Sequence, residues 1–162
     1  MKKLLLAHVN YNVWANQRIS QMLSINKELL DKEVPSSFTS LRKTVFHIWD
    51  AEIIWLARLK GNSMEYFPST QYEPETSIDK FPENSKEFAE FVESKDDVFL
   101  NTICHYKNTQ KKEFSNFNYE IILHCMNHST YHRGQLTTML RNLGVTELIT
   151  TDLIAYMREK KA

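Results

Sequence analysis

The most informative segment of the chain is residues 119–143, which read YEIILHCMNHSTYHRGQLTTMLRNL. Asn118 stands before the segment as a candidate N-cap, and Gly144 follows it as a residue that commonly ends a helix. We therefore predict a long helix from about Tyr119 to Leu143. It is the last of four long helices expected in the chain.

Histidines recur in this segment at intervals of four residues. A step of four residues turns the side-chain direction by only about 40° around the helix axis, so these residues share one face. The predicted face holds three histidines and three other residues: His124, His128, His132, Ile121, Gln135 and Met139. Because Ile121 and Met139 are typical core residues, we expect the imidazoles to point into the protein.

Neutral imidazoles buried side by side need partners, and a divalent cation can take their lone pairs. A third ligand has to come from another helix, and His47 is the candidate because Ala51 and Ile54 share its face. Such a histidine is also common as a hydrogen-bonded core or interface residue. Three imidazoles and a water would form a catalytic type of site, open to zinc, nickel, iron or copper. Ser129 stands where an HExxH helix carries its glutamate, so that general base is missing.

Two further polar positions are open to more than one interpretation. His124 could be a ligand, but one ion rarely reaches three successive turns of a helix, so it could instead line a pocket or orient a ligand. Asn16 and Ser20 lie within the inward stripe of the first helix, where they indicate either a hydrogen bond between helices or a polar pocket.

The rest of the chain favours an all-α fold, because it has only three glycines and four prolines. We expect a single domain, residues 1–162, built as a four-helix bundle. The simplest bundle is antiparallel, but a long surface loop at 62–81 leaves the topology open. Residues 104–118 could form a small β-hairpin or a loop. The first expected helix covers about Lys3–Asn26, and the second is capped by Ser36, Ser37 or Ser40 and ends before Gly61. A third helix is expected from Pro82 to Thr102, and a short last one over Asp152–Lys160.

Charge and cysteine content exclude several classes of protein. Twenty basic residues balance twenty acidic ones, which argues against a nucleic-acid binder that relies on a basic surface. Cys104 and Cys125 are too few for a disulfide framework, and no apolar run is long enough to span a membrane. We expect a cytoplasmic protein with two free thiols. The second helix is apolar on most sides, which predicts burial against a partner subunit in a homodimer.

The motif NHSTYHRGQL at residues 127–136 resembles the signature of the DinB/YfiT-like superfamily. The resemblance extends over nearly the whole chain, through YNVWAN (11–16), SFTSL (37–41), TVFHI (44–48), RNLGV (141–145) and DLIAY (152–156). It implies a four-helix bundle, usually homodimeric, with a divalent metal held by His47, His128 and His132, and it makes His124 a non-ligand. The family's hairpin is expected to contain a glycine, which residues 107–110 lack.

Members of this superfamily include bacillithiol-type thiol transferases, so the resemblance implies a low-molecular-weight-thiol S-transferase acting on a small-molecule substrate. The absence of a carboxylate base beside the histidines fits activation by the metal, with zinc or nickel as first choices. A metal-dependent hydrolase and a non-enzymatic stress protein that binds metal or ligand are the alternatives. Gln135 and Asn16 join His124 as candidate pocket residues or residues that orient the ligands.

Overall fold

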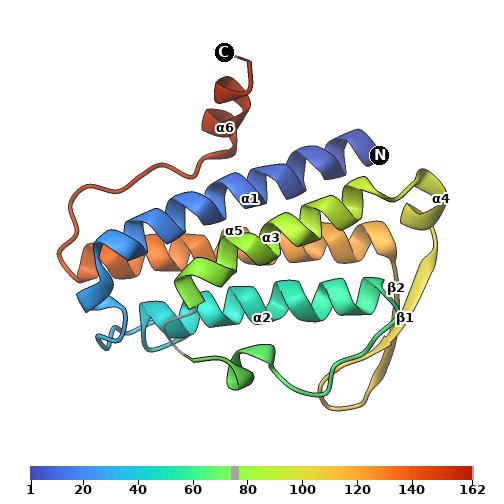
Figure 1. Cartoon of the computed structure of the whole chain (residues 1–162), viewed down its shortest axis with the longest axis horizontal. Coiled ribbons are helices and arrows are strands. Elements are labelled where there is room, and N and C mark those ends of the chain that lie inside the picture. Colours follow the sequence, from blue (N-terminus) through green and yellow to red (C-terminus); the bar gives the residue numbers. More distant parts are fainter. Residues whose placement is uncertain (74–76, 162) are drawn as a thin grey trace.

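The computed structural model describes residues 1–73 and 77–161 and shows a four-helix bundle with a small hairpin at one end (Figure 1). The all-α prediction is therefore confirmed. The elements are α1 (Lys2–Ile25), η1 (Lys27–Leu29), α2 (Leu41–Leu59), η2 (Pro68–Gln71), α3 (Ser77–Glu93), α4 (Asp97–Leu100), β1 (Ile103–Lys107), β2 (Glu113–Phe117), α5 (Asn118–Asn142) and α6 (Leu153–Glu159). In the described ranges, no helix combines the length and the apolar character needed to cross a membrane.

The four long helices do not simply alternate in direction. In the bundle, α1 and α2 each pack on both α3 and α5. The connection after α2 returns along the bundle before α3 begins, so α2 and α3 run in the same direction, as do α1 and α5 (Figure 1). The long segment between α2 and α3 is what allows this arrangement, which differs from the simple antiparallel bundle.

Two apolar clusters fill the bundle. One contains Val45 and Ile48 of α2 with Leu136 and Leu140 of α5. The other contains Leu56 of α2 with residues of α1, α3 and the first turns of α5. Between them they cover α2 so well that no residue from 44 to 59 is exposed. The all-round apolar pattern of α2 thus needs no partner subunit, and the homodimer stays a prediction.

Helix α3 begins five residues earlier than the sequence indicates. The expected loop 62–81 includes residues 74–76, which lie outside the described residues, but Ser77 to Phe81 are helical and Phe81 is fully buried. Pro82 is therefore inside the helix rather than in its first turn. At the other end, α3 stops at Glu93 and the short α4 follows, capped by the Asp96 carboxylate, which accepts from the Phe99 N–H.

The hairpin forms without the expected glycine. Strands β1 and β2 pair antiparallel, with Ile103 opposite Phe117 and Lys107 opposite Glu113. In the turn, Lys111 takes the left-handed conformation (φ 65°) that glycine would adopt at lower cost. The Asn108 side chain compensates by accepting from the backbone N–H groups of Gln110 and Lys112.

The ends of the helices confirm most of the expected caps. Ser40 is the N-cap of α2 and accepts from the Lys43 N–H, and the helix ends before Gly61 at φ 84°. Asn118 is not the N-cap of α5, because its side chain donates to the Phe99 carbonyl and α5 begins at Asn118 itself. Glu120 caps α5 instead, by accepting from the Phe117 N–H.

Candidate metal centre

Three histidines from two helices meet inside the bundle. His47 of α2 faces His128 and His132 of α5, and one ring nitrogen from each lies within 4.8 Å of the others. The Nε2 atoms of His47 and His128 are 2.9 Å apart. Among the described residues this group of candidate ligands contains no carboxylate and no thiol. The structure thus brings the three predicted ligands together: the helical spacing places His128 and His132 on one face, and the packing of α2 on α5 adds His47.

Gln135 orients one of the three imidazoles. Its Oε1 lies 2.7 Å from Nδ1 of His132, so this nitrogen carries the hydrogen and leaves the Nε2 lone pair free. The amide group of Gln135 is itself held, because its Nε2 donates to Ser37 Oγ (2.8 Å) and to the Tyr131 hydroxyl (3.2 Å). The predicted role of Gln135 as a residue that orients a ligand fits this geometry.

Burial keeps the cluster uncharged. Desolvation, followed by the neighbouring histidines, lowers the pKa of His128 to about 3 and the pKa of His47 to about 4. Desolvation also lowers the pKa of His132, and the hydrogen bond that this ring donates to Gln135 opposes that shift. At neutral pH all three rings therefore keep a lone pair. Nδ1 of His128 is buried with no hydrogen-bond partner in the described structure.

Aromatic rings flank the cluster on the side of the segment that precedes α2. The Phe38 ring lies 4.3 Å from the His47 ring and 5.8 Å from the His132 ring, centroid to centroid. The Tyr131 ring packs edge-on against His132 at 4.9 Å. These rings narrow access to the histidines from this side of the bundle.

His124 does not join the group of candidate ligands and is an exposed residue, so the predicted inward face does not extend to it. Its ring lies 6.1 Å from that of His128 and packs edge-on against Trp55 at 5.1 Å. It lines a pocket of about 330 Å³ at the hairpin end of α2 and α5. His124 could be a metal ligand, a pocket residue or a residue that orients a ligand; its position in the structure is consistent with a pocket residue.

Asn16 lies in a buried polar network that reaches all four long helices. Glu52 is completely buried in α2 and accepts hydrogen bonds from the side chains of Asn12, Asn16, Ser85 and Ser129. Arg133 of α5, also buried, donates to the amide oxygens of Asn12 and Asn16. Two amides therefore relay an ion pair between Glu52 and Arg133. Asn16 thus makes a hydrogen bond between helices rather than lining a pocket.

Sequence reasoning did not single out Glu52 or Arg133. A carboxylate next to the apolar residues Ile53 and Ile54 of α2 is the signal that could have identified Glu52, because a buried charge needs a partner. Burial raises the pKa of Glu52, while its hydrogen bonds and the charge of Arg133 oppose that shift. The network lies on the side of α5 that carries Ser129, next to His128, and so holds α5 against the other helices.

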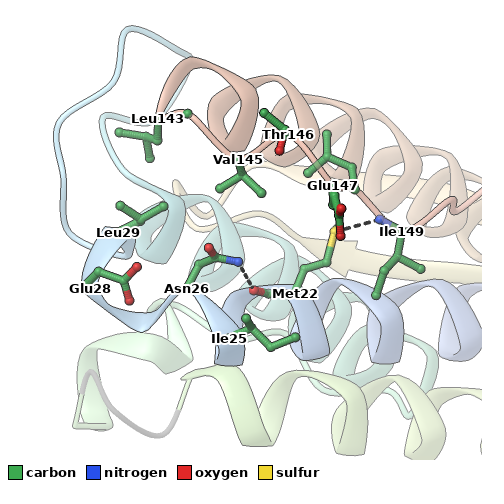
Figure 2. Close-up of a pocket in the computed structure, with 12 residues that line it drawn as sticks. Met22, Ile25, Asn26, Glu28, Leu29, Leu143, Val145, Thr146, Glu147 and Ile149 are labelled. Carbon is green, nitrogen blue, oxygen red and sulfur yellow. Dashed lines mark hydrogen bonds between the residues drawn. The ribbon is translucent and has the colours of Figure 1, made fainter.

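A larger cavity of about 980 Å³ lies at the other end of the bundle, between the C-terminal end of α1, η1 and residues 143–149 (Figure 2). Its wall includes Met22, whose sulfur accepts from the Ile149 N–H and whose carbonyl accepts from Asn26. None of the three histidines lines it. Although this cavity is larger than the pocket beside His124, it is not the candidate active site, because it contains none of the candidate metal ligands.

Comparisons with known proteins agree with this architecture. The chain is 28% identical to the protein DinB of Bacillus subtilis (strain 168) over 144 residues, which cover 83% of each protein. Its fold matches the crystal structure of a DinB-like protein from Bacillus cereus ATCC 10987, with a TM-score of 0.66 at 22% identity over 87% of this chain and 91% of that one.

The fold also matches YfiT from Bacillus subtilis, with a TM-score of 0.68 at 14% identity over 90% of this chain and 91% of that one. YfiT is described as a probable metal-dependent hydrolase with an unusual four-helix bundle topology. The family model of DinB matches residues 1–161, which is nearly the full length. The chain therefore belongs to the DinB family.

Proposed function

We propose that this protein holds one divalent metal ion between His47, His128 and His132 and is a metal-dependent enzyme, with transfer of a low-molecular-weight thiol as its reaction. The observation that carries the proposal is the convergence of three imidazole nitrogens from α2 and α5 within 4.8 Å. Zinc and nickel are the first choices, and iron or another transition metal would also accept this donor set.

The residues present fit such an ion. All three rings are neutral at pH 7, and the Nε2 atoms of His47 and His128 face each other at 2.9 Å. Without an ion, these two nitrogens have to share one hydrogen, whereas an ion between them would take both lone pairs. Three imidazoles without a carboxylate form the donor set of catalytic zinc sites that leave a position open.

When bound, a divalent ion supplies a Lewis acid and lowers the pKa of a coordinated thiol or water. The chain's own residues do the rest. Gln135 fixes the His132 ring and its tautomer, and the network around Glu52 and Arg133 holds α5 in place. Phe38 and Tyr131 pack against the rings of His47 and His132 and restrict their movement.

Thiol transfer is favoured over hydrolysis by the composition of the cluster. Hydrolases of the HExxH class place a glutamate beside the metal as general base. Here Ser129 occupies that position, and its hydroxyl donates to the Glu52 carboxylate of α2. A thiol needs no such base, since it ionises far more readily than water.

A metal-dependent hydrolase is the second candidate, because YfiT, which shares the fold, is described as one. A protein that binds metal or ligand without turnover is the third. All three functions share the same metal site and differ in what the protein does with a substrate.

Elemental analysis of protein purified without an affinity tag tests the metal site. We expect about one equivalent of a transition metal per chain, its loss in His128→Ala, and its retention in His105→Ala, which alters an exposed histidine on β1. Equal metal content in all three proteins would refute the site.

Activity assays then separate the functions. Metal-loaded protein is incubated with low-molecular-weight thiols and generic electrophiles, and separately with esters in the absence of thiol. Thiol-dependent turnover that disappears in His47→Ala supports the transferase. Turnover of esters alone supports the hydrolase, and metal binding with no turnover in either assay supports the third function.

A further inference from the structure

A pocket of about 330 Å³ lies one helical turn beyond the three histidines, towards the hairpin. This volume is at the lower end of the range for small-molecule sites, about 300–1,000 Å³. Side chains of α2, α5 and the hairpin form its walls: Trp55, Tyr106, Asn116, Glu120, Ile121 and His124. We refer to it as the Trp55 pocket.

Three rings shape this pocket. The Trp55 ring meets the Tyr106 ring edge-to-face at 5.3 Å and the His124 ring edge-to-face at 5.1 Å. Rings at such angles present both flat faces and edges to a compound bound in the pocket. Flat conjugated groups pack better against these surfaces than branched aliphatic groups do, because ring pairs gain energy beyond the area they bury.

The polar groups of the walls are mostly occupied. The Tyr106 hydroxyl donates to Asn116 Oδ1 (2.9 Å), and Asn116 Nδ2 donates to Glu120 Oε2 (3.1 Å). The same Glu120 oxygen also accepts from the Phe117 N–H. Two groups of the wall have no hydrogen-bond partner among the described residues, the Trp55 indole N–H and the His124 ring, and of these only the imidazole can accept as well as donate. A ligand in the pocket would therefore find its hydrogen bond at His124.

The charge around the Trp55 pocket is balanced. Glu120 contributes one negative charge to the wall. The Arg58 guanidinium is not part of the wall but lies against the rings behind it, 4.2 Å from the Trp55 centroid and 4.8 Å from the Tyr106 centroid. A cation already held by both rings disfavours a second cation on their free faces, and the carboxylate of Glu120 disfavours an anion.

We infer that the Trp55 pocket binds the flat, uncharged part of the substrate, an aromatic or similarly conjugated group, and that His124 fixes it through one hydrogen bond. The identification of the bound compound as a substrate rests on the proposed function. The His124 ring lies 6.1 Å from the ring of His128, one of the three candidate metal ligands. None of the three candidate ligands lines the pocket, but His124 lies one turn from His128, so a group held there extends towards the histidines and the pocket selects the electrophile by its shape.

A titration followed by NMR tests the inference on the full chain. The probe is para-nitrobenzyl alcohol, and the signals are the indole N–H groups, with that of Trp55 assigned through Trp55→Phe. We expect a saturable shift of the Trp55 signal and weaker binding of cyclohexylmethanol, which is neutral but not flat. Benzylamine and benzoate, which are flat but charged, are expected to bind at least several-fold more weakly than the neutral probe.

Matched variants locate the site. Tyr106→Leu removes one ring and is expected to weaken binding of the probe by about tenfold, the upper end for one aromatic pair. Tyr106→Phe keeps the ring and loses only a hydroxyl that points to Asn116, so its affinity is expected to stay close to that of the unaltered protein. His124→Phe keeps a ring but loses the hydrogen bond, with an expected loss of about fivefold. Thermal melts of each variant exclude loss of the fold as the cause.

The titration is run on metal-loaded protein and on protein treated with EDTA. Binding of the probe to both forms supports the pocket, whatever the outcome of the activity assays. The inference is overturned if the probe leaves the Trp55 signal unmoved, if Tyr106→Leu binds it as well as Tyr106→Phe does, or if a charged analogue binds better. The proposed function fails separately, by a lack of metal or turnover.

Discussion

Ser20 of α1 donates a hydrogen bond to the backbone carbonyl of Ile78 in α3, over 2.9 Å. Ile78 lies four residues before Pro82, and proline has no N–H to offer that carbonyl. The hydroxyl of a neighbouring helix thus supplies the bond that α3 cannot make for itself. It also explains a polar residue in the inward stripe of α1.

Removing this hydroxyl should destabilise the protein. We expect Ser20→Ala to lower the free energy of unfolding by about 1–2 kcal/mol, the cost of leaving a carbonyl without a partner away from water. Urea denaturation measures the change. In a Pro82→Ala background, the new N–H can bond the Ile78 carbonyl, so Ser20→Ala should cost clearly less there. Equal costs in both backgrounds would show that the Ser20 bond does not substitute for the missing one.

Gln135 should control metal affinity without touching the metal. Gln135→Leu removes the acceptor that holds Nδ1 of His132, and residues in this position typically change affinity by about 10–100-fold. Competition with a chromogenic chelator measures the affinity. Ser37→Ala, which removes only one acceptor of the Gln135 NH₂ group, serves as the control and should change the affinity less. If Gln135→Leu binds metal as tightly as the unaltered protein, the glutamine has no such role.

The relayed ion pair should contribute strongly to stability. In Glu52→Gln, an amide NH₂ group would face the donors of Asn12 or Ser85, and we expect a loss of about 3 kcal/mol in the free energy of unfolding. Glu87→Gln removes an exposed partner of Lys60 and should cost about 0–1 kcal/mol. A double variant with Arg133→Met should lose less than the sum of the two single changes. Strict additivity would mean that the two charges do not act on each other through the asparagine amides.

Acid should destabilise the metal-free protein through the histidines. The pKa values of His47 and His128 fall from 6.5 to about 4 and about 3 on folding. As the pH drops below 6.5, the unfolded chain takes up protons at these rings while the folded chain does not, so stability falls. Melting temperatures at pH 7.5 and pH 5 in EDTA test this. A His47→Ala/His128→Ala variant should show a smaller drop, and an equal drop would exclude these two rings as the cause.

The two thiols should differ in reactivity. Cys125 is completely buried, and burial raises the pKa of its thiol well above the usual 9. Cys104 is only partly buried, and its thiol donates to the Arg58 carbonyl. Ellman's reagent should therefore modify one thiol in the native protein and two after unfolding. Cys104→Ser should abolish the native reaction, and a reaction that persists in it would mean that Cys125 becomes accessible.

The bundle and the histidine cluster could be predicted because both depend on periodic patterns within single helices. The four-residue steps between His124, His128 and His132 determine their common face before any packing is known. The meeting of His47 with this face could only be proposed, since it depends on how α2 lies against α5. The resemblance of the NHSTYHRGQL motif to a known family supplied that missing relation.

Features that depend on contacts between distant segments were harder to predict. A proline normally marks the first turn of a helix, but inside α3 the Ser20 hydroxyl, 58 residues away from Ile78, bonds the carbonyl that Pro82 leaves without a partner. The absence of a glycine at 107–110 argues against a hairpin turn, but the Asn108 side chain stabilises the left-handed conformation of Lys111. Glu52 and Arg133 meet through residues of α1, which no local pattern in α2 or α5 reveals.

Helix α5 carries two of the candidate ligands and one wall of the Trp55 pocket, and Ser129, next to His128, is bonded to the buried Glu52 of α2. It therefore cannot rotate or slide to suit a different compound without disrupting the histidines. The remaining walls come from the C-terminal half of α2 and from the hairpin, which lies outside the bundle core. Broadening the range of accepted compounds by directed evolution should accordingly begin with libraries at positions 106 and 116 of the hairpin, and leave 119–143 untouched.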